Sequence, residues 1–326
     1  MSETPSVPYL SIIFTGRNDD FGGDFNTRLF RAIEFNHRHL TEHGISHEFV
    51  FVEWRPVPRK RWLAEVLAER YQALVPETLY SYVADIRYHD AYSLNPKLQF
   101  QEFIAKNIAI RRCRGRFLLT TNTDIYLGRG VLATLQRQRL DAKVLYRTRR
   151  IDLKENIDYD EIDWETLEDE RNYDRVNDIQ PPCYTNASGD FLLLDADTYR
   201  ELRGFNEVFR VAKVHMDSNF CLKAYSSGVP IVPLERPVYH AGLGTLNSQY
   251  SLYADRPQDA PWGDTRWKRA VVYHNPPTWG LANAPRREVA PGIHYLEFSW
   301  EAVPPIVDLR RVVLPAERAG RLEGVN

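Results

Sequence analysis

The residues best suited to chemistry in this 326-residue chain are carboxylates and a histidine placed where predicted strands or helices begin or end. Asp124 follows the predicted strand 116–121. A carboxylate at a strand end can reach a divalent cation, and Mg²⁺ and Mn²⁺ commonly take only one or two ligands from protein. Such a cation offsets charge on a departing diphosphate. Asn and Asp also favour turns, so the segment 120–124 alone indicates a turn about as strongly as a site.

Asp217 and His240 are candidates for the rest of such a reaction. Asp217 stands where a helical pattern begins, and by itself it is more readily interpreted as the N-cap of that helix. The alternative is a general base for an acceptor hydroxyl, kept ionised by the helix N-terminus. His240 ends the short predicted strand 238–240, where it is either a metal or diphosphate contact or a structural residue.

The elements that must position these residues alternate along the first half of the chain. Apolar runs predict strands, and apolar residues at helical spacing predict helices between them. This order predicts an α/β fold with a mostly parallel sheet covered by helices on both faces. Ligands bind such sheets at the carboxyl ends of the strands. The predicted strands are 9–15, 47–53, 79–86 and 116–121, and the predicted helices are 24–40, 62–71 and 97–112.

The second half of the chain has two unusual segments. The segment 152–178 is dense in Asp and Glu, and we interpret it as a solvated or mobile excursion. Beyond residue 242 the chain is rich in Pro, Trp and Tyr, and we expect it to wrap the domain. Its tryptophans could stack on sugar rings, although packing on the domain is the better interpretation for at least two of the three. They are Trp262, Trp267 and Trp279.

Composition and charge exclude several classes of protein. The net charge of −2 provides no basic field for nucleic acid. The three cysteines fit neither a zinc site nor a disulfide framework, which indicates a reducing compartment. The first residues lack the pattern of a signal peptide, and no apolar run is long enough to span a bilayer. We therefore expect a cytoplasmic protein without an integral membrane segment. A lipid-linked substrate, if it is the acceptor, could still bring the protein to a membrane surface.

The order of the motifs resembles the inverting glycosyltransferases of family 2, which have the GT-A fold. The segments 10–18 and 48–53 resemble the first two strands of that family, the second ending in an acidic residue near the nucleoside. The segments 105–107 and 114–119 resemble the helix and strand that lead into its DXD motif, which here reads Asn122-Thr123-Asp124. The acceptor side is similar at 189–191 and 204–207, followed by Met216-Asp217 and His240.

The resemblance implies a role for each matching residue. It implies Asp217 as the catalytic base, and Asp124 and His240 as ligands of Mn²⁺ or Mg²⁺. It implies that Gly189 and Asp190 contact the donor sugar or the acceptor. The residues implied to bind the nucleotide donor are Thr15, Arg17, Asp19, Glu53, Lys106, Asn122 and Thr123.

The same resemblance implies the domain limits and the partners. A GT-A domain would span 1–242, and the C-terminal extension would span 243–326. Within the domain, the nucleotide-binding half is expected near 8–128, the acidic excursion near 152–180 and the acceptor half near 183–242. The partners would be a nucleotide-sugar donor and a glycan, a lipid-linked molecule or a small molecule as acceptor.

This sequence departs from the family pattern at Asn122, where the family has Asp, and at Met216, where it has Glu. These departures keep a second hypothesis open, that of a non-catalytic sugar- or nucleotide-binding protein. A sugar nucleotidyltransferase is the third hypothesis. It would need a Gly- and Lys-rich loop after the first strand, and residues 16–20 have no lysine and a single glycine.

Overall fold

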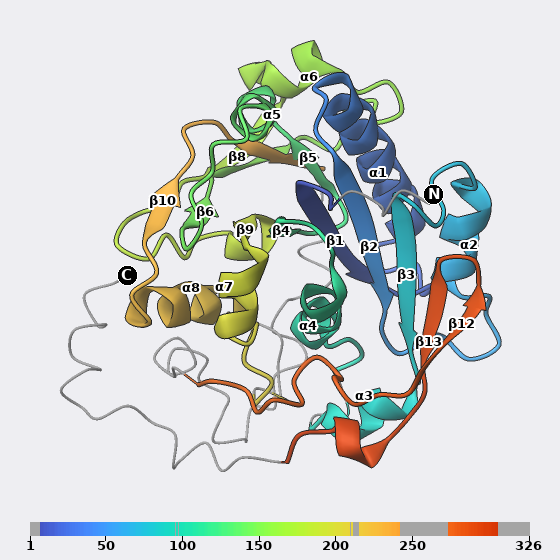
Figure 1. The fold of residues 1–326 in the computed structure, drawn as a ribbon. Helices are drawn as coiled ribbons and strands as arrows, with labels where there is room; N and C mark the ends of the chain where they lie inside the picture. Colours follow the sequence, from blue (N-terminus) through green and yellow to red (C-terminus); the bar gives the residue numbers. More distant parts are fainter. Residues whose placement is uncertain are drawn as a thin grey trace, which may run out of the picture.

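A nine-stranded sheet forms the centre of the molecule (Figure 1). The computed structural model describes residues 7–94, 96, 98–208, 210, 215–241 and 273–305. In the order β10-β6-β9-β4-β1-β2-β3-β13-β12, only β9 and β12 run against the other strands of this sheet. The predicted mostly parallel sheet is therefore confirmed. Its strands are β1 (Leu10–Gly16), β2 (His47–Glu53), β3 (Leu79–Ala84), β4 (Phe117–Thr120), β6 (Leu145–Arg147), β9 (Leu192–Asp195), β10 (Ile231–Pro233), β12 (Arg286–Ala290) and β13 (Ile293–Leu296).

Two separate apolar clusters cover the two faces of this sheet. Alternation along β1 sends Ile13 to one cluster and Phe14 to the other, because successive side chains of a strand point to opposite faces. The Ile13 cluster includes side chains of α4, α7 and α8, and the Phe14 cluster includes side chains of α1, α2 and α5. The prediction of helices on both faces is thus confirmed. The helices are α1 (Phe25–Glu42), α2 (Leu63–Arg70), α3 (Arg87–Tyr92), α4 (Glu102–Arg112), α5 (Arg129–Gln136), α7 (Ala196–Glu201) and α8 (Met216–Ser226).

The acidic segment is folded, which corrects the interpretation of a solvated excursion. A second sheet, in the order β5-β11-β7-β8, joins β5 (Ile125–Leu127), β11 (Val238–His240), β7 (Arg150–Leu153) and β8 (Tyr173–Asn177). Helix α6 (Trp164–Glu168) lies between β7 and β8 in the chain. Ile151, Leu153 and Leu167 are buried in a small core with side chains of α1 and β5. Charged residues outnumber these apolar ones in the segment, so the alternation is difficult to see in the sequence.

The described part of the C-terminal extension adds two strands to the main sheet. β13 pairs in parallel with β3, and β12 pairs with β13 as an antiparallel edge (Figure 1). Trp279 is 2% exposed and packs in the Ile13 cluster, with the guanidinium of Arg111 4.9 Å from the centre of its ring. Trp262 and Trp267 lie outside the described residues. In the ranges that the structure describes, no helix combines the length and the apolar character that crossing a membrane requires.

Candidate functional site

The carboxyl ends of β1, β2 and β4 bring the predicted site loops to one edge of the main sheet. The three strands are parallel neighbours, with Gly16 opposite Glu53 and Ile13 opposite Thr120. Strand β9 is antiparallel to β4, with Leu192 opposite Thr120, so the residues before β9 reach the same edge. The loop after β4 and the loop before β9 therefore lie side by side, as the following contacts show.

Asp124 and His240 meet where the small sheet adjoins this edge. The antiparallel pairing of β5 with β11 places His240 opposite Ile125, next to Asp124 in the chain. Asp124 Oδ1 lies 3.5 Å from His240 Nε2, and the two residues are 4% and 6% exposed. Arg28 of α1 donates from Nη1 to the other carboxylate oxygen, Oδ2, at 2.8 Å. Asp124 is thus held between a guanidinium and an imidazole.

These residues fit a divalent cation that takes two ligands from the protein. Asp124 Oδ1 is buried and has no hydrogen-bond partner among the described residues, which is unusual for a buried polar atom. A carboxylate oxygen beside an imidazole nitrogen is a donor pair that Mn²⁺ accepts, and phosphates and water commonly fill the other positions. The part of the chain that the structure describes has no larger group of His, Cys, Asp or Glu that could hold a metal ion.

The protonation of His240 reflects its two carboxylate neighbours. Burial lowers the pKa of the ring, but the negative charges of Asp124 and of Asp152 outweigh burial, so the pKa is raised. Burial by itself raises the pKa of Asp152, but the contacts with His240 and Arg150 lower it by more. The net pKa is below the usual value, so this group is a carboxylate at neutral pH. Charges alternate along the resulting row of side chains, which are Arg28, Asp124, His240, Asp152, Arg150 and Asp190.

Asn122 has a structural reason to be an amide. Its Nδ2 donates to Asp190 Oδ1 at 2.6 Å, and its Oδ1 accepts from Lys106 Nζ at 3.1 Å. A carboxylate in this place would face the carboxylate of Asp190 at hydrogen-bond distance. The same ammonium also pairs with Glu102 at 2.6 Å and donates to the carbonyl of Gly189 at 3.2 Å. Lys106 therefore joins the loop after β4 to the loop before β9, and three protein acceptors already occupy it.

Both carboxylate oxygens and the backbone carbonyl of Asp190 accept hydrogen bonds. Arg150 Nη1 donates to its Oδ2 at 2.5 Å, and its other carboxylate oxygen accepts from Asn122. Thr121 Oγ1 donates to its backbone carbonyl at 2.7 Å. With an exposure of 2%, Asp190 contributes to the shape of the edge and offers no free oxygen there. Thr123 is also nearly buried, at 7% exposure.

Asp217 is not the N-cap of its helix, and that interpretation was wrong. Helix α8 begins at Met216 with His215 in the cap position, so Asp217 lies inside the first turn. Its Oδ2 accepts from Ser188 Oγ at 2.8 Å and from the backbone N–H of Gly189 at 2.7 Å. No described residue donates to Oδ1. The carboxylate is therefore oriented by neutral donors and partly exposed, with one oxygen free of described donors.

The predicted nucleotide residues separate into two groups. Arg17 and Asp19 form an ion pair at 3.0 Å on the loop after β1, and both are partly exposed. Thr15 is 6% exposed, and Glu53 is fully buried. Glu53 Oε2 accepts the N–H of Ala64 at 3.0 Å, at the start of α2, and burial raises the pKa of this glutamate to about 7. Glu53 therefore points into the protein in this structure.

Four residues that shape the site were not predicted from the sequence. Arg28 lies four residues after Asp24 and pairs with it at 2.7 Å, a helical spacing that the sequence does display. Nothing in the sequence indicates that the same arginine reaches Asp124. Arg150 and Asp152 alternate with buried residues on β7, within a segment we had interpreted as an excursion. Ser188 precedes β9 and carries no motif of its own.

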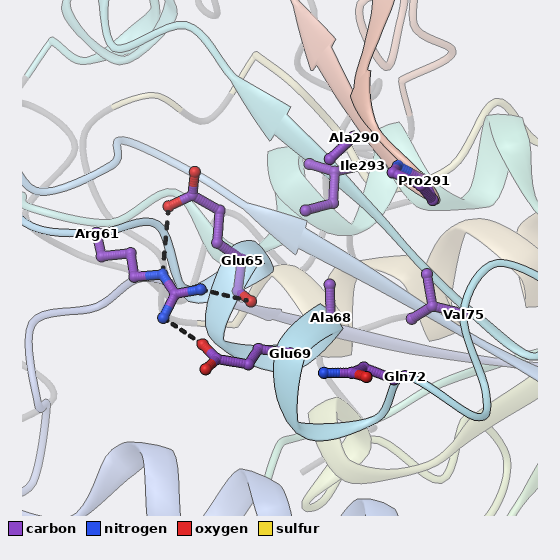
Figure 2. Close-up of a pocket in the computed structure, with 9 residues that line it drawn as sticks. All are labelled: Arg61, Glu65, Ala68, Glu69, Gln72, Val75, Ala290, Pro291 and Ile293. Atoms are coloured by element: carbon purple, nitrogen blue, oxygen red, sulfur yellow. Dashed lines mark hydrogen bonds and ion pairs between the residues drawn. The ribbon is translucent and has the colours of Figure 1, made fainter.

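A surface hollow elsewhere on the molecule shares no residue with this site (Figure 2). It lies between α2 and the turn that joins β12 to β13. Figure 2 shows Arg61 at its margin, paired with Glu65 and Glu69 of α2. The opposite wall is apolar and includes Pro291 and Ile293.

No protein-family model and no curated protein matches the chain. Solved structures that match include the catalytic domain of Drosophila beta1,4galactosyltransferase 7 with xylobiose, at 9% identity and a TM-score of 0.45 over 93% of this chain and 96% of that one. A mutant of that enzyme with manganese, UDP-Gal and xylobiose matches at 10% identity and 0.44, over 93% and 97%. The inositol-1-phosphate CTP transferase from T. maritima matches at 10% and 0.43, over 76% and 96%. At these TM-scores the matches do not identify the family of this chain.

Proposed function

We propose that the chain is a metal-dependent inverting glycosyltransferase of the GT-A fold, which moves a sugar from a nucleotide-diphosphate donor to an acceptor hydroxyl. One observation carries the proposal. Near the edge formed by the carboxyl ends of β1, β2 and β4, the buried Asp124–His240 pair lies beyond β4, and Lys106 links Asn122 to the carbonyl of Gly189, whose N–H binds the partly exposed Asp217. An edge of this kind is where α/β sheets bind their ligands. The acceptor is a glycan, a lipid-linked molecule or a small molecule.

Asp217 is the proposed general base. Its Oδ2 is fixed by Ser188 and Gly189, so Oδ1 is the oxygen that can take a proton. Asp217 lies in the first turn of α8, and the positive end of the helix dipole faces this position. In the proposed reaction, the acceptor oxygen attacks the anomeric carbon and gives its proton to Asp217. The bond from that carbon to the nucleoside diphosphate breaks in the same displacement.

Asp124 and His240 are the proposed metal ligands. When bound, Mn²⁺ or Mg²⁺ would neutralise charge on the diphosphate leaving group. Asp124 Oδ1 and His240 Nε2, 3.5 Å apart, present the two donors, while Arg28 keeps the carboxylate in place from its other oxygen. Arg17 and Asp19, on the adjacent loop, are proposed to contact the nucleoside, together with Thr15.

Asn122 and Lys106 are proposed to hold the loop after β4 in place. Their hydrogen bond fixes the backbone just before Asp124. This arrangement assigns a structural role to the amide that replaces the first acidic residue of the DXD pattern. The hydrogen bond from Asn122 to Asp190 supports this structural role.

The substitution Asp217→Asn tests the proposal. With a panel of nucleotide sugars, Mn²⁺ and mixed acceptors, we expect the wild-type protein to hydrolyse or transfer from at least one donor. Asp217→Asn should lower transfer at least about a hundredfold, the usual contribution of a general base, without weakening donor binding in calorimetry. The matched control is Asp197→Asn, because the side chain of Asp197 is 90% exposed.

One result would count against this function, and another against the role of Asp217 in it. A wild-type protein that neither binds nor hydrolyses any donor with Mn²⁺ present would support the non-catalytic hypothesis. Unchanged transfer in Asp217→Asn would remove Asp217 from the base position while leaving the glycosyltransferase activity standing.

A further inference from the structure

His240 has a second carboxylate beside it, on a strand that the sequence did not connect with the site. In the parallel pairing of β7 with β11, Asp152 is the register partner of His240. Asp152 Oδ1 lies 3.2 Å from Nδ1 of the ring, and Asp124 Oδ1 lies 3.5 Å from Nε2. The imidazole is therefore placed between two carboxylates, one at each ring nitrogen.

Asp152 is itself held firmly. Its Oδ2 accepts from Asn177 Nδ2 at 2.9 Å and from Arg150 Nη2 at 3.1 Å. Arg150 Nε lies 2.7 Å from the Oδ1 that faces the ring, and the guanidinium is anchored in turn by Asp190. Because Asn177 lies on β8 and Arg150 is itself anchored by Asp190, the carboxylate cannot move away from the ring without breaking these contacts.

The two distances favour one tautomer of a neutral ring. A neutral imidazole has one N–H, and the hydrogen bond at one nitrogen fixes the state of the other. Asp152 at 3.2 Å is within hydrogen-bond distance, whereas Asp124 at 3.5 Å is at its limit. Nδ1 and Asp152 Oδ1 are both buried and have no other hydrogen-bond partner among the described residues, so each is available to the other.

We propose that Asp152 is a positioning residue, which keeps the proton of His240 on Nδ1 and turns the lone pair of Nε2 toward Asp124. This inference rests on the proposed metal site. A metal-binding histidine commonly donates its other N–H to a carboxylate, which fixes the ring and increases the basicity of the ligand nitrogen. Strand β7 of the acidic segment therefore serves the site through His240 and does not touch the cation itself.

The tautomer of His240 tests the inference without any metal or activity. In full-length protein labelled with ¹⁵N-histidine, two-bond ¹H–¹⁵N spectra recorded over a pH series identify the neutral form of the ring and distinguish its two nitrogens. We expect Nδ1–H in the wild type and a shift toward Nε2–H in Asp152→Ala. Asp152→Asn retains a carbonyl acceptor and should restore Nδ1–H. The matched control is Asp174→Ala, since Asp174 lies exposed on the neighbouring strand β8.

The affinity for Mn²⁺ alone, measured by the electron spin resonance of the free ion, gives the second readout. Asp152→Ala should weaken binding about 10- to 100-fold, as expected for loss of an outer-shell partner, and Asp174→Ala should not change it. A wild-type Nε2–H tautomer, or an unchanged tautomer in Asp152→Ala, would overturn the inference. A wild type that binds no Mn²⁺ yet shows the expected tautomers would contradict the proposed metal site and leave the hold of Asp152 on His240 intact.

Discussion

The two proposed functional carboxylates are held in opposite ways. Asp124 is buried in a row of alternating charges, with a guanidinium on one oxygen and an imidazole near the other. Asp217 is partly exposed and is held by two neutral donors, a hydroxyl and a backbone N–H. Cationic partners fix a carboxylate strongly but also neutralise its charge. Neutral donors orient a carboxylate without neutralising it. The first arrangement suits a ligand that must stay in place, and the second suits a base that must accept a proton.

The largest expected effect concerns the stability of the buried row. Asp124→Asn removes the charge opposite Arg28, whose side chain is 5% exposed, and leaves a buried guanidinium with weaker pairing. Breaking a buried pair in this way costs about 3–5 kcal/mol of the free energy of unfolding. Asp217→Asn should cost less than about 1 kcal/mol, because it retains the neutral donors. Urea denaturation of both variants measures their free energies of unfolding. Equal losses of stability in the two variants would contradict the comparison.

A smaller effect is expected at Asn122. The substitution Asn122→Asp would place a carboxylate 2.6 Å from Asp190 Oδ1, where like charges raise the pKa of one group. Because the folded pKa would then exceed the unfolded one, this variant binds more protons when folded, and it should lose stability as the pH rises. We expect a loss of about 2 kcal/mol near pH 7 that shrinks below pH 4.

Denaturant midpoints measured across this pH range for the wild type and Asn122→Asp give the comparison. A variant with greater stability at neutral pH and tighter Mn²⁺ binding would show that the site prefers the DXD pattern. Such a result would refute the role that we assign to the Asn122–Asp190 pair.

The smallest expected effect concerns the neutral hydrogen-bond donors to Asp217. Ser188→Ala removes one of its two donors and leaves the N–H of Gly189. The net value of one such hydrogen bond is about 1 kcal/mol, so transfer should fall about fivefold to tenfold while Mn²⁺ affinity stays unchanged. Steady-state kinetics with the best donor would measure the fall. A weakened metal affinity would show that the two carboxylates are coupled, contrary to the comparison.

The sheet could be predicted from the sequence because its strands are short apolar runs. The predicted strand 47–53 matches β2 residue for residue, and strand 238–240 matches β11. The predicted helix 97–112 began too early, since α4 starts at Glu102. Helix α3 was missed, because its six residues are too few to display a period. Strands β7 and β8 were missed because charged residues separate their few buried ones.

The site was less predictable than the fold, for reasons of distance along the chain. Asp124 and His240 could be proposed from their places next to or at the end of a strand, and Asp124 Oδ1 lies 3.5 Å from His240 Nε2 in the structure. Their partners could not, since Arg28 precedes Asp124 by 96 residues. In the sequence, Asn122 is a departure from the family pattern. Only the position of Asp190 in the structure shows why an amide is suitable there.

Binding of nucleoside diphosphates tests the central claim most directly, because it requires neither the right acceptor nor the right sugar. Calorimetry of the full chain with a panel of nucleoside diphosphates, with and without Mn²⁺, would measure it. We predict that at least one nucleotide binds with Mn²⁺, that chelation weakens this binding, and that Asp124→Asn abolishes the metal dependence while Asp217→Asn retains it. Failure of every nucleotide to bind, or metal-dependent binding that survives Asp124→Asn, would contradict the account.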